Sequence, residues 1–324
     1  MNTKSTVLAY LNENANQWVT SSELVKQLEV SRTAIWKAIQ QLQNNGQKIE
    51  SQSGKGYRYA RGGMLSRAII EATISSNWQV KVYDQVNSTN IQAKQLAASN
   101  QGEKIVIIAN EQTDGYGRFG RDFFSPSETG IYLSFLLPLT KQINPGRMTT
   151  ATAVVVAQTL EKLFNVKVSI KWVNDLIVND HKVTGILSEA VTDFETGTIA
   201  DVVVGIGINL MENDLLDESL KPKVGALIKQ KKQLDRNQVA SEIIEAFEKM
   251  LLTFESGNLM EEYRIRSIVI GKQVEVKIGN RILTGLVETI NDDGALILKT
   301  DSETITVDAG EITKLNLQEG NYHG

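Results

Sequence analysis

The stretch Glu-Gln-Thr-Asp-Gly-Tyr-Gly-Arg-Phe-Gly-Arg at residues 111–121 decides between two folds for this chain. Its three glycines spell G-x-G-x-x-G, which is typical of a dinucleotide-binding turn when a strand precedes it and a helix follows. An apolar strand pattern does precede it at residues 105–108. Residues 122–126 and 131–137, however, predict a loop and a second strand where the helix should begin. The pattern therefore predicts a glycine-rich loop that wraps an anionic ligand with backbone amides and with the side chains of Arg118 and Arg121.

Composition argues against several classes of site. The chain has 324 residues, of which 41% are hydrophobic, enough for two or three globular domains. It has no cysteine, which excludes disulfides and thiolate chemistry, and its two histidines, His181 and His323, argue against a His-dependent triad or a multi-His metal site. No run approaches the roughly eighteen apolar residues of a membrane span, and the first five residues lack an apolar signal core. We therefore expect a cytoplasmic protein with no membrane partner.

Charge is unevenly distributed along the chain. The net charge is −4, but residues 1–61 carry eight Lys or Arg against four Glu. This head therefore has a charge of +4 and the remainder a charge of −8. A basic head on an acidic body predicts nucleic-acid contact at one end of the molecule.

The head carries the pattern of a winged helix-turn-helix. Apolar spacing predicts a helix over residues 5–14, a second begun by a capping box at 20–23, and a third, capped by Ser31, that ends at 44–46. Residues 48–59 predict a β-hairpin that would form the wing. Two helices joined by a tight turn, the second polar and basic on its outer face, are typical of DNA-binding domains.

The residues expected to face DNA lie on the outer face of the third helix and in the wing: Ser31, Arg32, Thr33, Trp36, Lys37, Gln40, Lys55 and Arg58. One alternative is a small helical bundle whose charges are merely solvated. Trp36 has an alternative of its own, in which it packs against the wing instead of facing a groove.

The remainder of the chain predicts two further folded units. Residues 64–268 mix helical patterns, among them a long helix over 148–164, with strand patterns that indicate an α+β domain with a largely antiparallel sheet. After residue 268, turn signals at Gly279-Asn280 and Asp292-Asp293-Gly294 separate short alternating strands. These strands are expected at residues 273–278, 281–290, 295–299 and 303–307.

Four segments of the body together resemble the motifs of the biotin protein ligases, in the same order and at similar intervals. They are Asn-Ser-Thr-Asn at 87–90, the glycine-rich stretch at 112–121, Lys-Trp-Val-Asn-Asp at 171–175 and Lys-Val-Thr-Gly-Ile-Leu at 182–187, followed by a Gly-x-Gly-Ile-Asn at 205–209. The head resembles that of the bifunctional bacterial branch, which also represses biotin genes. The resemblance implies an α+β fold of three domains: a winged helix-turn-helix at 1–63, a mixed α/β catalytic domain of the biotin/lipoate ligase type at 64–268, and a small SH3-like β-barrel at 269–324.

The resemblance also implies an activity, its cofactors and its partners. Such a ligase joins biotin to ATP to form biotinyl-5′-AMP, with Mg²⁺ as the metal, and then transfers biotin to a lysine of a biotin carboxyl carrier domain of a biotin-dependent carboxylase. Biotinyl-5′-AMP would also be the corepressor of a homodimer that binds operator DNA. The chemistry requires cations at the α-phosphate, where negative charge builds, and a cavity that excludes water from the reactive anhydride.

Matched position by position, the resemblance implies three groups of site residues. The catalytic group is Lys182, Arg118 and Asp175, where Asp175 would orient Mg²⁺ or accept a proton, or else be a buried cap. The residues implied for biotin are Ser88, Thr89, Asn90, Gln112, Gly115, Tyr116, Gly117, Arg118 and Lys182. Those implied for the adenylate are Arg121, Phe123, Asn174 and Asn209. Simpler interpretations are that Ser88 and Thr89 are helix N-caps and that Lys182 is an exposed turn lysine.

Three positions depart from the family pattern. Tyr116 stands where Arg is usual, Phe123 where many members have Trp, and Val173 where Pro is usual. Tyr116 in place of Arg puts a role of the side chain at this position in doubt. Contact with biotin through the backbone amides remains. The same departure also supports an alternative function, a biotin-sensing repressor without ligase activity. A lipoate ligase, a further alternative, shares the catalytic fold but has a different glycine-rich loop and no helix-turn-helix head.

Overall fold

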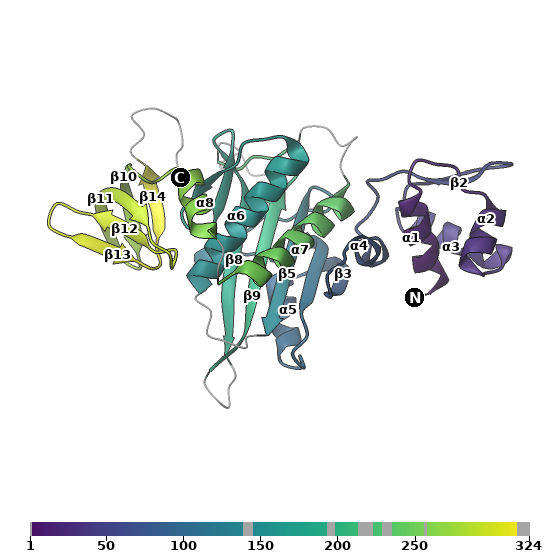
Figure 1. Cartoon of the computed structure of the whole chain (residues 1–324), viewed down its shortest axis with the longest axis horizontal. Helices are drawn as coiled ribbons and strands as arrows, with labels where there is room; N and C mark the ends of the chain where they lie inside the picture. The colour runs from purple at the N-terminus through teal and green to yellow at the C-terminus, as the bar shows by residue number, and fades with distance from the viewer. Residues whose placement is uncertain are drawn as a thin grey trace.

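The computed structural model describes residues 2–138, 145–192, 198–212, 223–228, 235–255 and 258–315. His323 and the last residues of the predicted tail lie outside these ranges. The described chain forms three parts in a row, with a helical head at one end, a central sheet covered by helices, and a small sheet at the other end (Figure 1). This order follows the order of the sequence.

The head is built by three helices whose starts are fixed by side-chain caps. They are α1 (Thr3–Glu13), α2 (Ser21–Leu28) and α3 (Arg32–Asn44). The hydroxyl of Thr20 accepts from the backbone N–H of Glu23 at 3.1 Å, and that of Ser31 accepts from Ala34 at 3.2 Å. These bonds satisfy N–H groups that a helix start leaves without partners. Both predicted caps are confirmed.

The predicted wing is the antiparallel pair β1 (Ile49–Gln52) and β2 (Gly56–Tyr59). Tyr57 of the wing pairs with Val19, just before α2, through two backbone hydrogen bonds of 2.8 and 2.9 Å. Gly56 permits this approach, because a Cβ there would lie 2.1 Å from the carbonyl oxygen of Val19. The wing is therefore anchored beside the helix-turn-helix.

Helix α4 (Arg67–Thr73) belongs to two cores at once. Ile69 is buried in the apolar cluster of the head, whereas its neighbour Ile70 is buried in the central cluster. The junction is also hydrogen-bonded, since the side chain of Asn237 accepts from Ser66 N–H at 2.8 Å and donates to the carbonyl of Met64 at 3.2 Å. The head is thus packed against the central part and is not joined to it by a free linker.

The central part is a seven-stranded sheet in the order β3-β4-β5-β9-β8-β7-β6. Only β3 and β4 run parallel among these neighbours, which confirms the prediction of a largely antiparallel sheet. The strands are β3 (Gln79–Val86), β4 (Ile105–Gln112), β5 (Gly130–Pro138), β6 (Ser169–Lys171), β7 (Asp175–Val178), β8 (His181–Thr192) and β9 (Ile199–Asn209). The strand β5 follows the glycine-rich loop where a dinucleotide-binding fold would place a helix.

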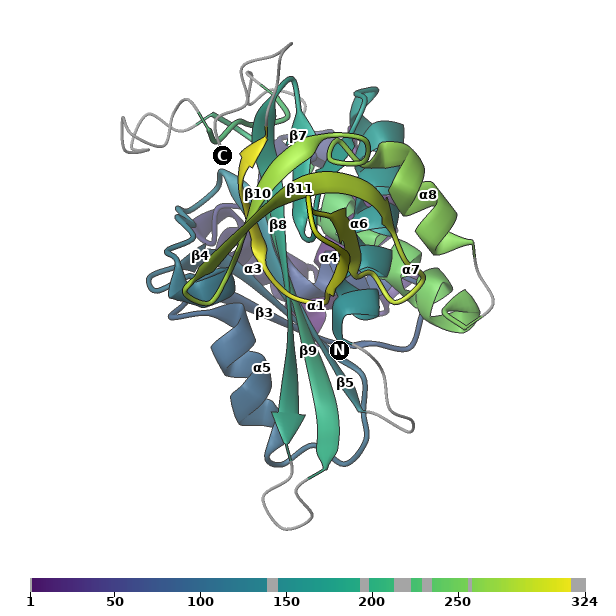
Figure 2. The same ribbon diagram turned by 90° about the vertical axis from the view of Figure 1, so that its left-hand side faces the viewer.

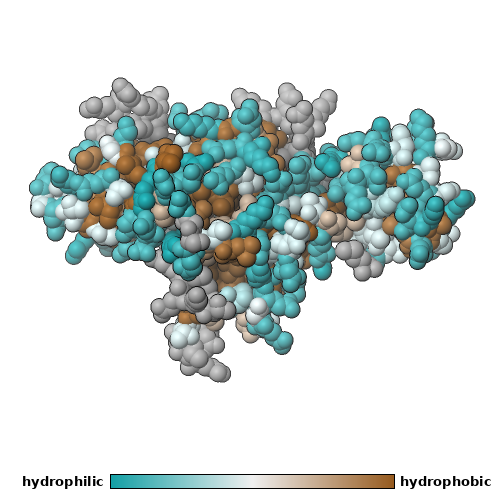
Figure 3. Space-filling model, in the orientation of Figure 1, coloured by the Kyte–Doolittle hydropathy of each residue, from teal (hydrophilic) through white to brown (hydrophobic). Residues whose placement is uncertain are grey.

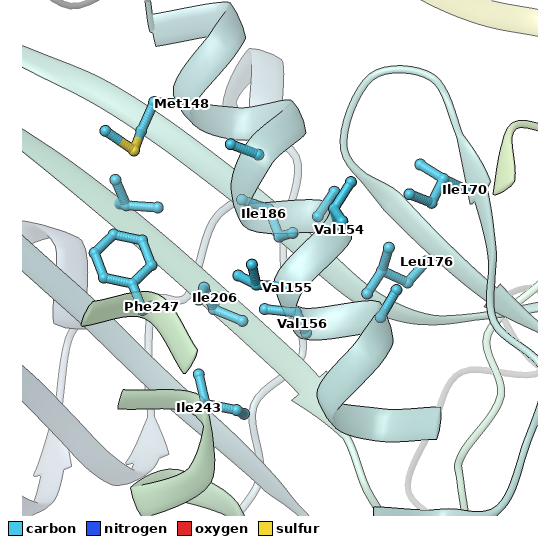
Figure 4. Packing of buried hydrophobic residues seen from close by; sticks show 14 of the residues in the cluster. Met148, Val154, Val155, Val156, Ile170, Leu176, Ile186, Ile206, Ile243 and Phe247 are labelled. Carbon is cyan, nitrogen blue, oxygen red and sulfur yellow. The ribbon is translucent and has the colours of Figure 1, made fainter. Parts of the chain in front are cut away.

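Alternating side chains divide the sheet between two layers. Val106 and Ile108 join the large cluster under α6 (Pro145–Phe164) and α7 (Arg236–Thr253), whereas Ile105 and Ile107 join a smaller cluster with Ala93 of helix α5. Figure 4 shows the large cluster, in which Val154, Val155 and Val156 of α6 lie beside the strands. Helix α5 (Thr89–Ala97) therefore covers the face opposite α6 and α7.

The C-terminal part is a five-stranded antiparallel sheet in the order β13-β12-β11-β10-β14, strongly curved in Figure 2. The predicted strands appear as β10 (Gln273–Ile278), β11 (Arg281–Ile290), β12 (Leu296–Lys299) and β13 (Thr304–Val307). Two elements were not predicted: β14 (Glu311–Leu315) and the helix α8 (Leu259–Arg266). Four of the eight residues of α8 are charged, so its sequence lacks a wide apolar stripe.

On the face seen in Figure 3 hydrophilic residues predominate, with apolar residues in patches between them. None of the described helices is both long and apolar enough to cross a membrane.

Candidate active site

The four motif segments meet at one cavity of about 980 Å³, on the face of the sheet that carries α5. Of the residues implied for catalysis, biotin and adenylate, all but Gly115 line it. Gly115 lies behind the lining, where a Cβ would come within 2.6 Å of the carbonyl oxygen of Phe123. Its role is therefore to allow the loop to fold closely on itself.

Glycines form the floor of the cavity. Gly185 of β8 pairs with Gly207 of β9, and Gly205 lies two residues along the same strand. A Cβ on Gly207 would lie 2.4 Å from the ring of Phe123, and one on Gly205 would lie 2.2 Å from Oδ1 of Asn90. The neighbouring residues Ile186 and Ile206 are buried beneath α6 (Figure 4). The pleat thus presents bare backbone to the cavity and apolar side chains to the core.

The first motif is held by side-chain hydrogen bonds at the start of α5. The backbone N–H and hydroxyl of Thr89 both donate to Oε1 of Gln112, at 2.8 and 3.1 Å. Nε2 of Gln112 donates in turn to Ser125 Oγ at 2.8 Å. Ser88 occupies the N-cap position, but its side chain makes no capping hydrogen bond. The interpretation of these residues as simple caps is therefore wrong.

The side chain of Tyr116 has two polar partners. Its hydroxyl donates to Oε2 of Glu189 at 2.8 Å and accepts from the ammonium of Lys94 at 3.1 Å. Burial and the hydrogen bond to Glu189 raise the pKa of Tyr116. Burial acts to lower the pKa of Lys94, but the hydrogen bonds to Glu189 and Tyr116 outweigh it and the pKa is raised. The sequence offered no role for this side chain, and neither partner was among the predicted residues.

Lys182 and Asp175 form an ion pair at the cavity wall, with 2.7 Å between Nζ and Oδ1. Their side chains are 29% and 20% exposed, so Lys182 is not an exposed turn lysine. The backbone of Lys182 is fixed as well, since its N–H donates to the carbonyl of Lys223 at 2.9 Å and its carbonyl accepts from Gly225 at 2.9 Å. The predicted catalytic cation and carboxylate therefore contact each other.

The two loop arginines reach the C-terminal sheet. Arg118 donates to the carbonyl of Gly310 at 3.0 Å and to Oδ1 of Asn174 at 3.5 Å. Arg121 forms a bidentate ion pair with Glu311 at the start of β14. Burial lowers the pKa of Arg118, against the opposing charges of Asp175 and Glu311. The sequence treated residues after 268 as a separate unit, so it missed the contribution of β14 to this cavity.

Lys171 is a further cation of the cavity to which the sequence assigned no role, although it begins a recognised motif. Its side chain is buried, with 7% of its surface exposed. Burial lowers the pKa of Lys171, and the charges of Asp175 and Glu311 act in the opposite direction. The cavity thus concentrates positive charge from Lys171, Lys182 and the loop arginines, as a polyphosphate ligand requires.

The head presents its predicted DNA-facing residues at the surface. The side chains of α3 named above are exposed, and Trp36 is 56% exposed, so the interpretation that it packs against the wing is wrong. The aromatic residue beside the wing is Trp18, whose ring centroid lies 5.7 Å from Lys55 Nζ and 5.0 Å from the guanidinium of Arg58. Arg58 also pairs with Glu50 at 2.6 Å.

Comparison with known proteins agrees with this organisation. Residues 82–209 match the Biotin/lipoate A/B protein ligase family, residues 3–58 match an HTH domain, and residues 269–315 match the Biotin protein ligase C terminal domain. The chain is 30% identical to the bifunctional ligase/repressor BirA of Bacillus subtilis over 317 residues, covering 91% of this chain and 93% of that protein. It is also 30% identical to BirA of Escherichia coli over 301 residues, covering 91% and 92%.

A solved structure shows the same catalytic fold. The biotin protein ligase from Aquifex aeolicus in complex with biotin and ATP superposes with a TM-score of 0.62 at 25% identity, covering 72% of this chain and 97% of that one. The chain is therefore a member of the biotin protein ligase family, of the bifunctional ligase/repressor type.

Proposed function

We propose that this chain is an ATP-dependent ligase that forms biotinyl-5′-AMP and transfers biotin to a lysine of a biotin carboxyl carrier domain, and that the adenylate-bound chain represses biotin genes. The observation that carries the proposal is the single cavity that joins all four motifs, with a hydrogen-bonding end at Thr89 and Gln112 and cations at Lys171, Lys182 and the loop. Biotin offers a neutral ureido ring at one end and a carboxylate at the other, and the two ends of the cavity suit these groups.

In the first step a carboxylate oxygen of biotin attacks the α-phosphorus of ATP, and the bond to the bridging oxygen breaks to release pyrophosphate. Lys182 is placed to lie between the biotin carboxylate and the α-phosphate, where its positive charge offsets the charge that builds on the phosphate oxygens. Its pair with Asp175 at 2.7 Å orients the ammonium before substrates arrive. Arg118, half-buried at the cavity wall and hydrogen-bonded to Gly310 and Asn174, adds a second cation with a fixed direction.

In the second step the amine of the acceptor lysine attacks the acyl carbon of the adenylate. An amide bond forms, the bond to the phosphate oxygen breaks, AMP leaves and the amine gives up a proton. Asp175 is the carboxylate of the wall that we assign to receive that proton. The loop between Gly115 and Arg121 excludes water from the anhydride while the acceptor approaches.

The remaining residues bind the two halves of the adenylate. We assign the ureido ring to Ser88, Thr89 and Gln112, supported by their position at the start of α5, with Asn90 and backbone amides of Gly115, Tyr116 and Gly117 around it. Asn174 and Asn209 are assigned to the adenine or ribose, Phe123 to stacking on the adenine, and Arg121 to the phosphate. Phe123 lies so close to Gly207 that a Cβ there would come within 2.4 Å of its ring.

ATP is expected to bring Mg²⁺ with it. Among the described residues no group of three or more Asp, Glu or His side chains could hold a metal ion by itself. Mg²⁺ commonly uses one or two carboxylates together with substrate phosphates, and Asp175 fits such a partial site. The metal would supply further charge neutralisation at the phosphates.

The head makes the second activity possible. One recognition helix makes too few contacts for useful specificity, so we propose that operator DNA is bound by a homodimer that forms when biotinyl-5′-AMP is present. We place the domain boundaries at 1–63, 64–268 and 269–324, and the site of action in the cytoplasm, where ATP, acceptor and operator occur together. A biotin sensor without ligase activity would not need both the Lys182–Asp175 pair and the half-buried Arg118 in one cavity.

Mass spectrometry tests the ligase directly. The chain mixed with ATP, Mg²⁺, biotin and a biotin carboxyl carrier domain should add one biotin to one acceptor lysine, with biotinyl-5′-AMP detectable when the acceptor is omitted. If the chain formed the adenylate but transferred no biotin, a biotin-sensing repressor without ligase activity would describe it better. Absence of both products would overturn the proposed ligase.

A further inference from the structure

Three side chains close the first half of the glycine-rich loop onto the catalytic sheet. Tyr116 comes from the loop, Lys94 from α5 and Glu189 from β8, and each contacts the other two. The hydroxyl of Tyr116 lies 2.8 Å from Glu189 Oε2, and the ammonium of Lys94 lies 2.6 Å from Glu189 Oε1. We call this group the loop latch.

The latch combines several favourable interactions in a partly buried place. The side chains of Lys94 and Glu189 are 37% and 22% exposed, so water screens their attraction only in part. The ammonium also lies 5.6 Å from the centroid of the Tyr116 ring, within the range of a cation–π interaction. Hydrogen bonds to charged groups are stronger than those between neutral groups, and both bonds of the Tyr116 hydroxyl are of this kind.

The latch continues into the residues assigned to biotin. Asn90 donates through Nδ2 to the same oxygen of Glu189 that accepts from Tyr116, at 2.7 Å. Ser134 contacts both Oδ1 of Asn90, at 2.6 Å, and Oγ1 of Thr89, at 2.7 Å. Thr89 then donates to Gln112, which completes a connected path from the loop to the ureido end of the cavity. A change in the latch can therefore displace the residues that we assign to biotin binding.

The far end of the loop, at Arg121, is attached differently. Arg121 pairs with Glu311 of the C-terminal sheet, but its side chain is 64% exposed. An exposed pair contributes little to stability. The loop therefore has a firm attachment at Tyr116, inside the catalytic domain, and a looser one at Arg121.

We propose that Tyr116 is a positioning residue that acts through Lys94 and Glu189 to hold the glycine-rich loop over biotin, and so sets how long biotin and its adenylate are retained. This inference rests on the proposed ligase function. It gives the side chain at position 116 a role that contact through the backbone alone would not require.

Tyr116→Phe is the direct test, because it keeps the ring and removes only the hydroxyl. We expect biotin to dissociate about tenfold faster, as for loss of one well-placed hydrogen bond to a charged group, and hydrogen exchange of residues 115–121 to increase. The effect should fall on the KM for biotin more than on the turnover number at saturating biotin, because the hydroxyl touches no reacting atom. A general structural defect would lower turnover and melting temperature instead.

Two comparisons sharpen the test. Tyr83→Phe removes a hydroxyl that makes no hydrogen bond within the described part of the chain, and it should leave biotin release unchanged. Lys94→Met should accelerate biotin release, as Tyr116→Phe does. The double variant should release biotin about as fast as the faster of the two single variants, because the two residues act as one unit.

The outcomes separate this inference from the function on which it rests. A wild-type chain that neither binds biotin nor ligates it would overturn the proposed function. A wild-type chain that ligates, with Tyr116→Phe releasing biotin at the wild-type rate, would overturn the latch alone. Strictly additive effects of Tyr116→Phe and Lys94→Met would also reject it.

Discussion

The ammonium of Lys182 lies 2.7 Å from Oδ1 of Asp175 across two adjacent strands of the central sheet, β8 and β7. The strands are joined at Asn179 and Asp180, whose φ angles of 48° and 62° are those of a tight hairpin turn. The register places Lys182 opposite Ile177 and Asp175 opposite Gly185, so the side chain of Lys182 runs along the hairpin past Gly185 to reach Asp175. The pair that we propose as catalytic is thus a consequence of a local hairpin.

Lys182→Ala should abolish most adenylate formation. The variant loses a cation at the point where charge develops and leaves Asp175 without its partner, so we expect a loss on the order of 10²-fold or more in the rate. Pyrophosphate release measures it. Lys272→Ala, an exposed lysine outside the cavity lining, is the matched control and should behave like wild type. Near-normal turnover by Lys182→Ala would mean that the catalytic cation lies elsewhere.

Arg118→Gly should loosen the hold of the loop on the adenylate. The variant loses the partly buried hydrogen bonds to Gly310 and Asn174 and gains backbone freedom. We expect the intermediate to escape and to label exposed lysines of unrelated proteins, which mass spectrometry of a mixed protein sample would detect. The Arg121→Gly variant should release less of the intermediate, because the side chain that it loses is 64% exposed. Labelling confined to the acceptor would contradict a retaining role for Arg118.

Stability at high pH should depend on Tyr132. Burial raises the pKa of Tyr132 from 10.0 to about 12. Because the unfolded chain loses this proton first, the contribution is fully present below pH 10 and is lost as the pH rises through 12, by up to about 2.7 kcal/mol for two pKa units.

Tyr132→Phe isolates that effect. It should cost about 1 kcal/mol at neutral pH, through loss of the hydrogen bond to the carbonyl of Pro126 at 2.9 Å. Thermal unfolding should then show a shallower decline for the variant than for wild type between pH 10 and 12. Parallel declines would show that the hydroxyl ionises as freely in the folded chain as in the unfolded one.

Gly205→Ala should damage the biotin end of the cavity. The new methyl group would lie 2.2 Å from Oδ1 of Asn90, so that side chain must leave its bonds with Ser134 and Glu189. We expect a destabilisation of about 1–3 kcal/mol, typical of overpacking, and weaker biotin binding by calorimetry. If the clash is the cause, adding Asn90→Ala should recover part of the lost melting temperature. No recovery would point to a backbone effect.

Biotin and ATP together should strengthen both self-association and operator binding. A coupling of about 1–3 kcal/mol would be enough to change operator occupancy several-fold or more. Sedimentation and operator titration with and without the two ligands measure it, and an added acceptor domain should reverse it by consuming the adenylate. Operator affinity indifferent to biotin and ATP would leave a ligase with a constitutive DNA-binding head.

Removal of residues 1–63 should abolish DNA binding while ligation survives in part. The expected partial loss follows from α4, because Ile69 is buried against the head and would become exposed. Lower melting temperature with retained ligation is the expected outcome, and Ile69→Ser in the shortened chain should recover solubility without recovering DNA binding. Complete loss of ligation in both chains would mean that the head is needed to form the cavity.

Local signals in the sequence determined most of the elements and the order of the site motifs. The caps at Thr20 and Ser31, the hairpin after Val178 and the strand after the glycine-rich loop all depend on residues a few positions apart, where spacing and side-chain chemistry act directly. The same applies to the four ligase motifs, whose residues line one cavity. Helix α8 was not predicted because it is highly charged, and strand β14 was not predicted because it is short.

Tertiary structure alone decided how distant segments complete the site. Glu311 reaches Arg121 across 190 residues, and Glu189 reaches Tyr116 across 73, because the order of the strands and the packing of the C-terminal sheet bring them together. No periodicity in the sequence encodes such a distance. The sequence by itself determined the four motifs that line the cavity, whereas the fold added Lys171 and Glu311 to it and decided which side chains hold the loop, since contacts between remote side chains depend on the packed arrangement of whole elements.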